Sequence, residues 1–161
     1  MNKTILLAVD AARHVQAAVD MTRELSEDSG DKVVVLHVHE MAIGRFGRIR
    51  VDCGEGEGEA LVDSIVTALR AAGITTEGQV QEADFGHLSR KVLAVADELD
   101  ARIIVLGSRG RTDMPHLPLG SVSHRLLHVA RRPVLIVPRV PVPEPVTAEQ
   151  QTSAATAGAA G

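Results

Sequence analysis

The sequence predicts an α/β fold: a single-domain, open, doubly wound sheet of five parallel strands, with helices on both faces. Several apolar runs show no alternation with polar residues, which indicates strands buried on two sides, as parallel strands are. Between these runs, apolar residues recur at helical spacing. A chain of 161 residues is long enough for one complete core, so a single domain is expected.

Five segments have the character of strands. The most apolar are residues 4–9, 32–38 and 102–106, which are continuous β-branched and aliphatic runs. Residues 74–81 alternate more weakly and include a glycine, and residues 133–138 are bracketed by prolines, which cannot donate ladder hydrogen bonds. The last two segments are therefore expected at the edges of the sheet.

Four amphipathic helices are expected between the strands, which gives the strand–helix alternation of a doubly wound sheet. Their apolar faces are formed by Val15, Ala18, Val19, Thr22 and Leu25; by Leu61, Ile65, Leu69 and Ala72; by Leu88, Val92, Val95, Ala96 and Leu99; and by Val122, Leu126, Val129 and Ala130. Two segments lack such a period. Residues 44–59 are expected to be a mobile loop within a domain spanning residues 1–139, and residues 140–161 a disordered tail rich in Pro, Ala and Gly.

Composition narrows the classes of function. The chain has 17 Lys and Arg against 21 Asp and Glu, a formal charge of −4 that gives no basic surface for nucleic acid. It has one cysteine, which suits a reducing cytoplasm, and no apolar run approaches the roughly 20 residues of a membrane span. We therefore expect a cytoplasmic protein that binds neither nucleic acid nor membrane.

The residues that suggest a ligand site lie at the ends of two strands. Ligands of open α/β sheets bind beyond the carboxyl ends of the strands, where the strand order reverses. Asp10 closes the first strand and Gly107 closes the fourth. If these strands are neighbours, both residues face one crevice. A carboxylate at a strand end also often caps the next helix, here one expected to start near Ala11, so both roles stay open for Asp10.

The residues that follow the fourth strand are suited to binding phosphate. Gly107 and Gly110 leave backbone N–H groups unobstructed, and Gly120 and Ser121 open the fourth helix, whose unpaired N–H groups attract anions. Glycine also serves ordinary turns, and serine is a common N-cap, so the pattern alone does not establish a phosphate site. Neither a P-loop motif nor the dinucleotide-binding G-x-G-x-x-G is present.

The spacing Gly107-x2-Gly110-x9-Gly120-Ser121, continued as VSHRLLHVARRPVLIVP, resembles the ATP-binding motif and final strand of the universal stress protein family. The opening ILLAVD and the second-strand ending LHV are also similar to that family. The resemblance covers roughly residues 2 to 138. It implies a Rossmann-like sheet of the adenine nucleotide alpha hydrolase type, with strand order 3-2-1-4-5.

The resemblance also implies ATP or another adenine nucleotide in the crevice, together with Mg2+. Val38 and Leu106 would flank the adenine, and Asp10 would hold the ribose or a phosphate-bound Mg2+. The remaining implied contacts are to the phosphates, from the backbone of Gly107, Gly110, Gly120, Ser121 and Val122 and from the hydroxyl of Ser123. Because the chain has no Trp or Tyr, aliphatic side chains would have to hold the adenine ring.

Three functions remain open at this point. The first is an ATP-binding regulatory protein of the stress response, and the second is a slow ATP hydrolase that uses the same site. No dedicated general base is evident beside Asp10, so no catalytic residue is assigned and enzymatic activity is expected to be weak at most. The third is a nucleotide-free dimeric module, which Ala11-Ala12 favours because the family usually has a small polar pair there. An apolar edge strand needs covering, and the resemblance implies the same arrangement: a homodimer paired through residues 133–138.

Two histidines and the cysteine have no expected role. His37 and His39 alternate along a strand and so share a face, but no third and fourth ligands appear at a matching spacing. They are expected to be packing or surface residues. Cys53 follows Asp52, whose charge raises the pKa of a neighbouring thiol, so the cysteine is expected to be unreactive.

Overall fold

The computed structural model describes residues 3–11, 15–108 and 119–138. Its elements are β1 (Thr4–Val9), α1 (Gln16–Ser29), β2 (Lys32–Gly44), β3 (Gly47–Arg50), α2 (Glu57–Ala71), β4 (Thr76–Asp84), α3 (Leu88–Glu98), β5 (Ala101–Gly107), α4 (Ser121–Val129) and β6 (Val134–Val137). The expected tail, residues 140–161, and the segment 109–118 that contains Gly110 lie outside the described residues.

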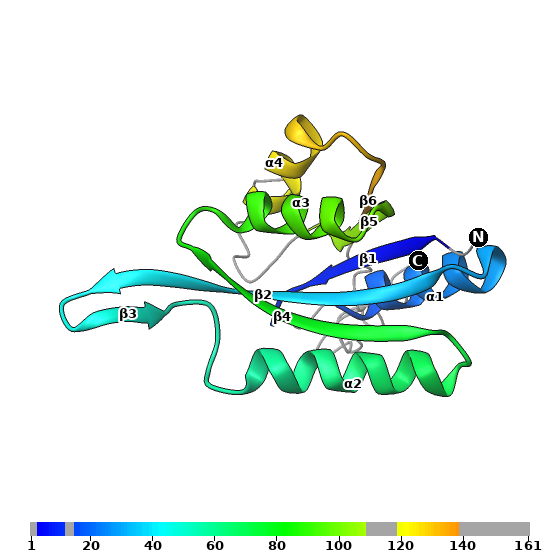
Figure 1. Ribbon diagram of the computed structural model, residues 1–161, viewed down its shortest axis with the longest axis horizontal. Coiled ribbons are helices and arrows are strands. Elements are labelled where there is room, and N and C mark those ends of the chain that lie inside the picture. Colours follow the sequence, from blue (N-terminus) through cyan, green and yellow to red (C-terminus); the bar gives the residue numbers. More distant parts are fainter. Residues whose placement is uncertain (1–2, 12–14, 109–118, 139–161) are drawn as a thin grey trace, which may run out of the picture.

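Five strands form the expected parallel sheet, in the spatial order β4, β2, β1, β5 and β6. These are the third, second, first, fourth and fifth of the strands expected from the sequence, so the α/β class is confirmed. The sheet nevertheless has six strands, because β3 pairs antiparallel with the far end of β2. Helices α1 and α2 cover one face, and α3 and α4 cover the other (Figure 1).

The continuous apolar runs are explained by these two layers. In β1, Ile5, Leu7 and Val9 pack towards α1 and α2. Leu6 points the other way, into the core under α3 and α4. Successive residues of a strand face opposite sides, so a strand covered twice must be apolar at every position. None of the helices within the described ranges is both long and apolar enough to cross a membrane.

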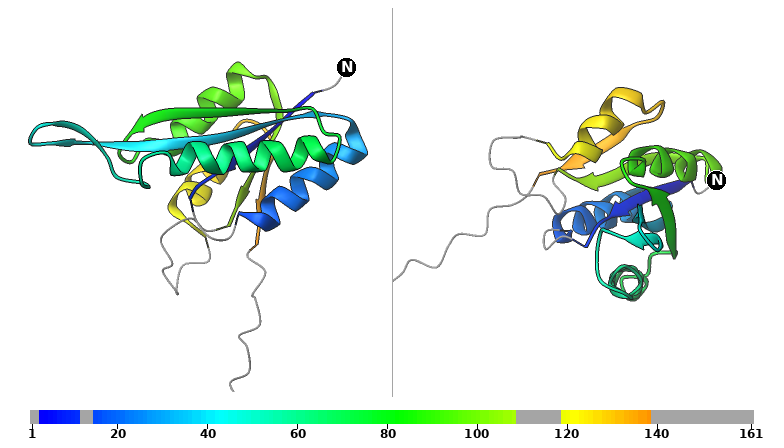
Figure 2. Two further views of the ribbon diagram at one scale, coloured as in Figure 1. Left: turned by 90° about the horizontal axis from the view of Figure 1, so that it is seen from below. Right: turned by 90° about the vertical axis from the view of Figure 1, so that its left-hand side faces the viewer.

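Residues 44–59 differ from the expected mobile loop. Residues 47–50 form β3, and α2 already begins at Glu57. The hairpin of β2 and β3 projects beyond the rest of the sheet (Figures 1 and 2) and leaves Ile43 and Phe46 almost fully exposed. A projecting hairpin covers no core, so its sequence has no periodic apolar face from which it could be predicted.

The buried face of α2 is also rotated from the expected one. Val62 and Val66 are buried together with Ile65 and Leu69, whereas Ala72 is exposed. The cause is the close approach of α2 to β4. A Cβ atom on Gly78 of β4 would lie 2.6 Å from Cγ1 of Val62, so only glycine lets the helix pack at this distance.

Candidate functional site

The strand order reverses at β1, the point at which a ligand crevice was expected. β1 pairs with β5 in a register that sets Ala8 beside Leu106. Asp10 directly follows β1, and Gly107 ends β5, so the two residues lie at the ends of adjacent strands, as expected. Helix α1 begins only at Gln16, so the capping role considered for Asp10 at a helix near Ala11 is wrong.

Two hydrogen bonds fix the start of α4 against the end of β5. The Gly120 N–H donates to the Ser108 carbonyl oxygen at 2.8 Å, and the Ser123 hydroxyl donates to the Gly107 carbonyl oxygen at 2.9 Å. Ser123 is 3% exposed, so its hydroxyl holds the fold here. Ser121, by contrast, is exposed.

The first turn of α4 carries donors that the helix itself does not use. The first intrahelical bond of α4 runs from the His124 N–H to the Gly120 carbonyl oxygen. The N–H groups of Ser121, Val122 and Ser123 precede this bond, so they have no acceptor within the helix. No side chain caps α4 within the described part of the chain. This helix end therefore offers backbone N–H groups and a positive dipole beside Gly107.

The residues expected to flank an adenine ring share one core cluster. Val38 of β2 and Leu106 of β5 are 4% and 5% exposed and pack on the α3 and α4 face of the sheet. Ala8, between them on β1, packs against the same cluster. Of the expected nucleotide residues, Gly110 lies outside the described residues; the structure places the others at this edge.

A second group of polar side chains lies on the opposite face of β2. His37 and His39 are each 2% exposed. The Oδ2 atom of Asp52 lies 2.9 Å from Nδ1 of His39 and 3.1 Å from Nε2 of His37. Both histidines are buried, which agrees with the packing role expected from the sequence, but Asp52, which no sequence spacing indicated, lies beside them. We call His37, His39, Asp52 and Cys53 the His–Asp–Cys cluster.

The hairpin register brings Asp52 to the histidines. Gly44 pairs with Gly47 across a two-residue turn, and Met41 pairs with Arg50. The Val51 N–H continues this ladder by donating to the Glu40 carbonyl oxygen at 2.9 Å. One step further, His39 stands opposite Asp52, and opposite residues of an antiparallel pair lie on the same face. The GRFG turn was the sequence signal from which this register could have been counted.

Cys53 and the first turn of α2 close the cluster. The Sγ atom of Cys53 lies 3.7 Å from Nε2 of His37 and from Nδ1 of His39, and its thiol donates to Asp52 at 3.1 Å. A Cβ atom on Gly58 would lie 2.4 Å from Cδ2 of His37 and 2.6 Å from Cε1 of His39. Glycine is therefore required at position 58 for α2 to pack on the two rings.

The electrostatics of the cluster follow from burial and hydrogen bonding. Burial raises the pKa of the Cys53 thiol to about 11, with the hydrogen bond to Asp52 adding to the effect, as expected from the sequence. Burial also acts to raise the pKa of Asp52. The hydrogen bonds from His39, Cys53 and His37 outweigh that effect and hold the Asp52 pKa well below its usual range.

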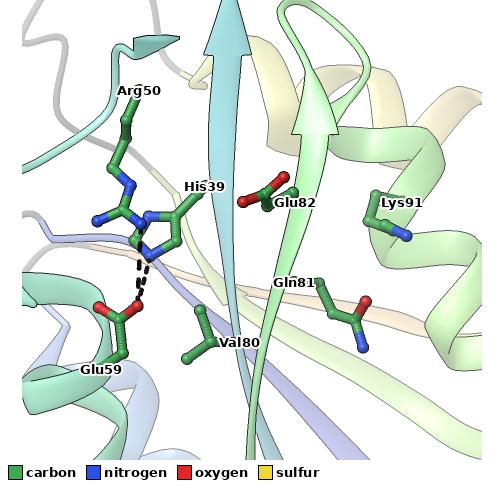
Figure 3. Close-up of a pocket in the computed structure, with 7 residues that line it drawn as sticks. All are labelled: His39, Arg50, Glu59, Val80, Gln81, Glu82 and Lys91. Carbon is green, nitrogen blue, oxygen red and sulfur yellow. Dashed lines mark hydrogen bonds and ion pairs between the residues drawn. The ribbon is translucent and has the colours of Figure 1, made fainter. Parts of the chain in front are cut away.

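An open hollow of about 500 Å³ adjoins the cluster at His39. It is lined by His39, Arg50, Glu59, Val80, Gln81, Glu82 and Lys91 (Figure 3). In Figure 3, Glu59 faces both the His39 ring and Arg50. The Glu59 Oε1 atom lies 3.2 Å from Nε2 of His39 and 4.0 Å from the Arg50 guanidinium. Its backbone hydrogen bond and then the bond to His39 lower the pKa of Glu59.

Comparison with known proteins identifies relatives of the whole domain. A sequence model described as the universal stress protein family matches residues 1–138. A universal stress protein of Thermus aquaticus is 30% identical over 142 residues, which cover 85% of this chain and 99% of that protein. It is described as the universal stress protein in the QAH/OAS sulfhydrylase 3′ region.

Two solved structures with the same fold contain nucleotides. A universal stress protein of Archaeoglobus fulgidus in complex with dAMP superposes with a TM-score of 0.61 at 18% identity, covering 85% of this chain and 98% of that one. A universal stress protein in complex with cAMP superposes with a TM-score of 0.63 at 23% identity, covering 84% of this chain and 96% of that one.

Proposed function

The chain belongs to the universal stress protein family, and from this premise we propose that it binds an adenine nucleotide where β1, β5 and α4 meet. The observation that carries the proposal is the anchoring of α4. Its N-terminal turn is held by the Gly120 and Ser123 hydrogen bonds beside the end of β5, next to Asp10. Relatives with this fold bind dAMP and cAMP, which supports the same class of ligand here.

Each residue has a proposed role that suits its position. The backbone N–H groups of Ser121, Val122 and Ser123 bind the phosphates, with Gly107 and Gly120 giving the phosphates close access. Asp10 binds the ribose or a Mg2+ ion carried by the phosphates. Val38 and Leu106 contact the adenine from either side of β1. Gly110 completes the phosphate loop, and the hydroxyl of Ser123 acts mainly by fixing Gly107.

The nucleotide is proposed to be ATP with Mg2+, acting as a regulatory ligand of the stress response. The residues placed at this edge offer N–H donors and one carboxylate, which suit binding, and no second acid or base is assigned there. The alternative function is slow hydrolysis of ATP at the same site. Phosphate release by the wild-type chain should stay at the level of the Asp10→Asn variant. Release that depends on Asp10 would assign a hydrolase function instead.

Isothermal titration with Mg-ATP, AMP and cAMP tests the proposal. The Gly120→Val variant should bind at least about tenfold more weakly, a loss of roughly 1.4 kcal/mol, because a branched side chain obstructs the phosphate. Gly44→Val, in the exposed hairpin, is the matched control and should bind normally, since the hairpin lies away from the proposed nucleotide site and the added Cβ atom meets only ordinary contacts. Wild-type protein that binds none of the three nucleotides, or Gly120→Val protein with unchanged affinity, would contradict the proposal.

We also propose a homodimer paired through β6. β6 pairs with β5 along one side. The carbonyl oxygens of Pro133 and Val137 accept hydrogen bonds from the Ile104 and Ser108 N–H groups, so odd-numbered residues face β5. The backbone groups of Val134 and Ile136 therefore point away from β5. Ile136→Pro removes one outward donor, and light scattering should then report a monomer with unchanged far-ultraviolet circular dichroism. A folded variant that stays dimeric would refute pairing through this edge.

A further inference from the structure

The His–Asp–Cys cluster has the composition and geometry of a metal centre. We propose that it binds one divalent transition-metal ion of the zinc type, which joins β2 to the segment between β3 and α2. The proposed ligands are Nε2 of His37, Nδ1 of His39, Oδ2 of Asp52 and Sγ of Cys53. All four ligand-bearing side chains present their atoms within 4.8 Å of one another.

The distances between ligand atoms suit a tetrahedral ion. Zinc bonds of roughly 2.0–2.3 Å at tetrahedral angles separate neighbouring ligand atoms by about 3.3–3.6 Å. The cluster has 3.7 Å from Sγ to each histidine nitrogen, 3.1 Å from Sγ to Oδ2, and 2.9 and 3.1 Å from Oδ2 to the nitrogens. Shifts of a few tenths of an ångström would therefore bring these five distances into the tetrahedral range, and the two ring nitrogens already lie within 4.8 Å of each other.

Each histidine ring also has a hydrogen-bond partner outside the cluster. These partners determine which ring nitrogen carries a proton and which can bind a metal. Nδ1 of His37 lies 3.0 Å from the Val9 carbonyl oxygen, which can only accept, so that nitrogen carries the proton. Nε2 of His39 lies against the carboxylate of Glu59, so it also carries a proton. With a metal bound, each ring keeps this outer proton and directs its bare nitrogen at the ion. Metal-bound histidines have this arrangement, with the other nitrogen donating to a carbonyl or carboxylate.

The carboxylate of Asp52 is oriented in the same way. Its Oδ1 atom accepts the Glu40 N–H at 3.1 Å, which leaves Oδ2 directed at the rings and the thiol. Without a metal, protons must lie between Oδ2 and the thiol and ring nitrogens that contact it. A divalent cation in place of those protons satisfies all four atoms. Its charge is also balanced by the thiolate and the carboxylate, so the buried centre is neutral.

The ligand types and the packing define the class of site. Sulfur and imidazole ligands favour zinc-like ions over Mg2+ and Ca2+, which prefer oxygen. Four protein ligands fill a tetrahedral sphere, and Gly58 packs α2 directly on both rings, so no position is left for a substrate. We therefore assign a structural role: the ion holds the Asp52–Cys53 segment to β2.

Cobalt substitution tests the proposal on the full-length chain. The protein is treated with a chelator, kept reduced and titrated with Co2+. One equivalent should produce a near-ultraviolet thiolate-to-cobalt charge-transfer band and the intense visible bands of tetrahedral cobalt, and Zn2+ should abolish both. Because Cys53 is the chain's only cysteine, the charge-transfer band reports on this residue alone. Binding should also release protons, since the thiol must ionise.

Two variants complete the experiment. Cys53→Ser should lose the charge-transfer band and bind Co2+ at least about 100-fold more weakly. This loss exceeds the one expected when a residue that only hydrogen-bonds to a metal ligand is removed. The matched control replaces His124 and His128 of α4 with Gln. These exposed rings have their Nε2 atoms 3.4 Å apart and are an alternative cobalt site, yet their loss should leave the band unchanged. No thiolate band in reduced wild-type protein with excess Co2+ would overturn the proposal, as would a band that persists in Cys53→Ser or disappears in the α4 control. If the band is absent, the short contacts among the four side chains are hydrogen bonds made by their own protons.

Discussion

The proposed nucleotide site at β1, β5 and α4, called the crevice below, and the His–Asp–Cys cluster lie at the same edge of the sheet but are built in different ways. The crevice is proposed to offer mainly backbone N–H groups, and its residues follow from glycine spacing along one stretch of chain. The cluster consists of side chains that a hairpin register brings together. Strand alternation separates the two, because Val38 faces the α3 and α4 layer while His37 and His39 face α1 and α2.

The two sites differ in whether a short sequence pattern is sufficient to locate them. A backbone site needs bare residues next to a helix start, which a short sequence motif can specify. A side-chain site depends on which strands pair and in which register. A hydrogen bond links the two, from Nδ1 of His37 to the carbonyl oxygen of Val9, the residue before Asp10. The predictions below test whether the two sites are as separate as this geometry indicates.

The largest effect is expected at Gly58. In Gly58→Ala, the new methyl group would overlap both imidazoles, so we expect a loss of about 3 kcal/mol in the free energy of unfolding, the upper end of overpacking costs. Cobalt affinity should fall as well. Gly78→Ala is the matched control: it overpacks α2 against β4 at Val62 and should lower stability without changing cobalt affinity. Urea unfolding and cobalt titration measure both. Equal cobalt losses in the two variants would mean that the cluster merely reports on α2 packing.

The second prediction concerns the thiol in metal-free protein. Because burial and Asp52 raise the Cys53 pKa to about 11, the thiolate fraction at pH 8 is small and increases steeply with pH up to and through that value. Alkylation by iodoacetamide should therefore be about 100-fold slower in the folded chain than in urea, where the pKa is near that of an ordinary thiol, about 8.5–9. Asp52→Asn should recover part of the rate. Equal rates in folded and unfolded protein would show that Cys53 is not held in the cluster.

Much of the fold could be predicted because burial leaves a pattern in the sequence. β1, β2 and β5 each contain a continuous apolar run, and the order of strands and helices follows from those runs. The same apolar runs also placed Asp10 and Gly107 at the ends of two strands. β3 could not, because its Arg48 and Arg50 flank one exposed isoleucine, a pattern that no core imposes.

The cluster was missed for a related reason. Asp52 and Cys53 are more than ten residues from His37 and His39 in sequence, and only the turn between Gly44 and Gly47 makes them neighbours. Spacing rules for metal ligands assume short, regular separations and therefore find no pattern here. The buried state of the two histidines was also hidden, because Gly58, the residue that allows α2 to cover them, stands in a glycine and glutamate alternation typical of a loop.

A smaller effect is expected when the outer partner of His39 is removed. Glu59→Ala releases Nε2 of His39, so the ring is no longer fixed with its lone pair towards the centre, and cobalt affinity should fall about tenfold. Glu82→Ala removes the same charge from the same hollow without touching the cluster, since Glu82 pairs with Arg48. It should leave cobalt affinity within about twofold. Equal losses would mean that Glu59 acts only through the local potential.

The smallest effect separates two serines at the start of α4 and returns to the crevice. Ser123→Ala leaves the carbonyl oxygen of Gly107 without its buried donor and should cost about 1 kcal/mol in the free energy of unfolding. Ser121→Ala, at an exposed position without that bond, should cost much less. Nucleotide affinity should fall modestly in Ser123→Ala, since the helix start is held less firmly, while the cobalt spectrum stays unchanged. If cobalt binding changed together with the crevice, the two sites would be coupled through Val9, and the separation drawn from strand alternation would not hold.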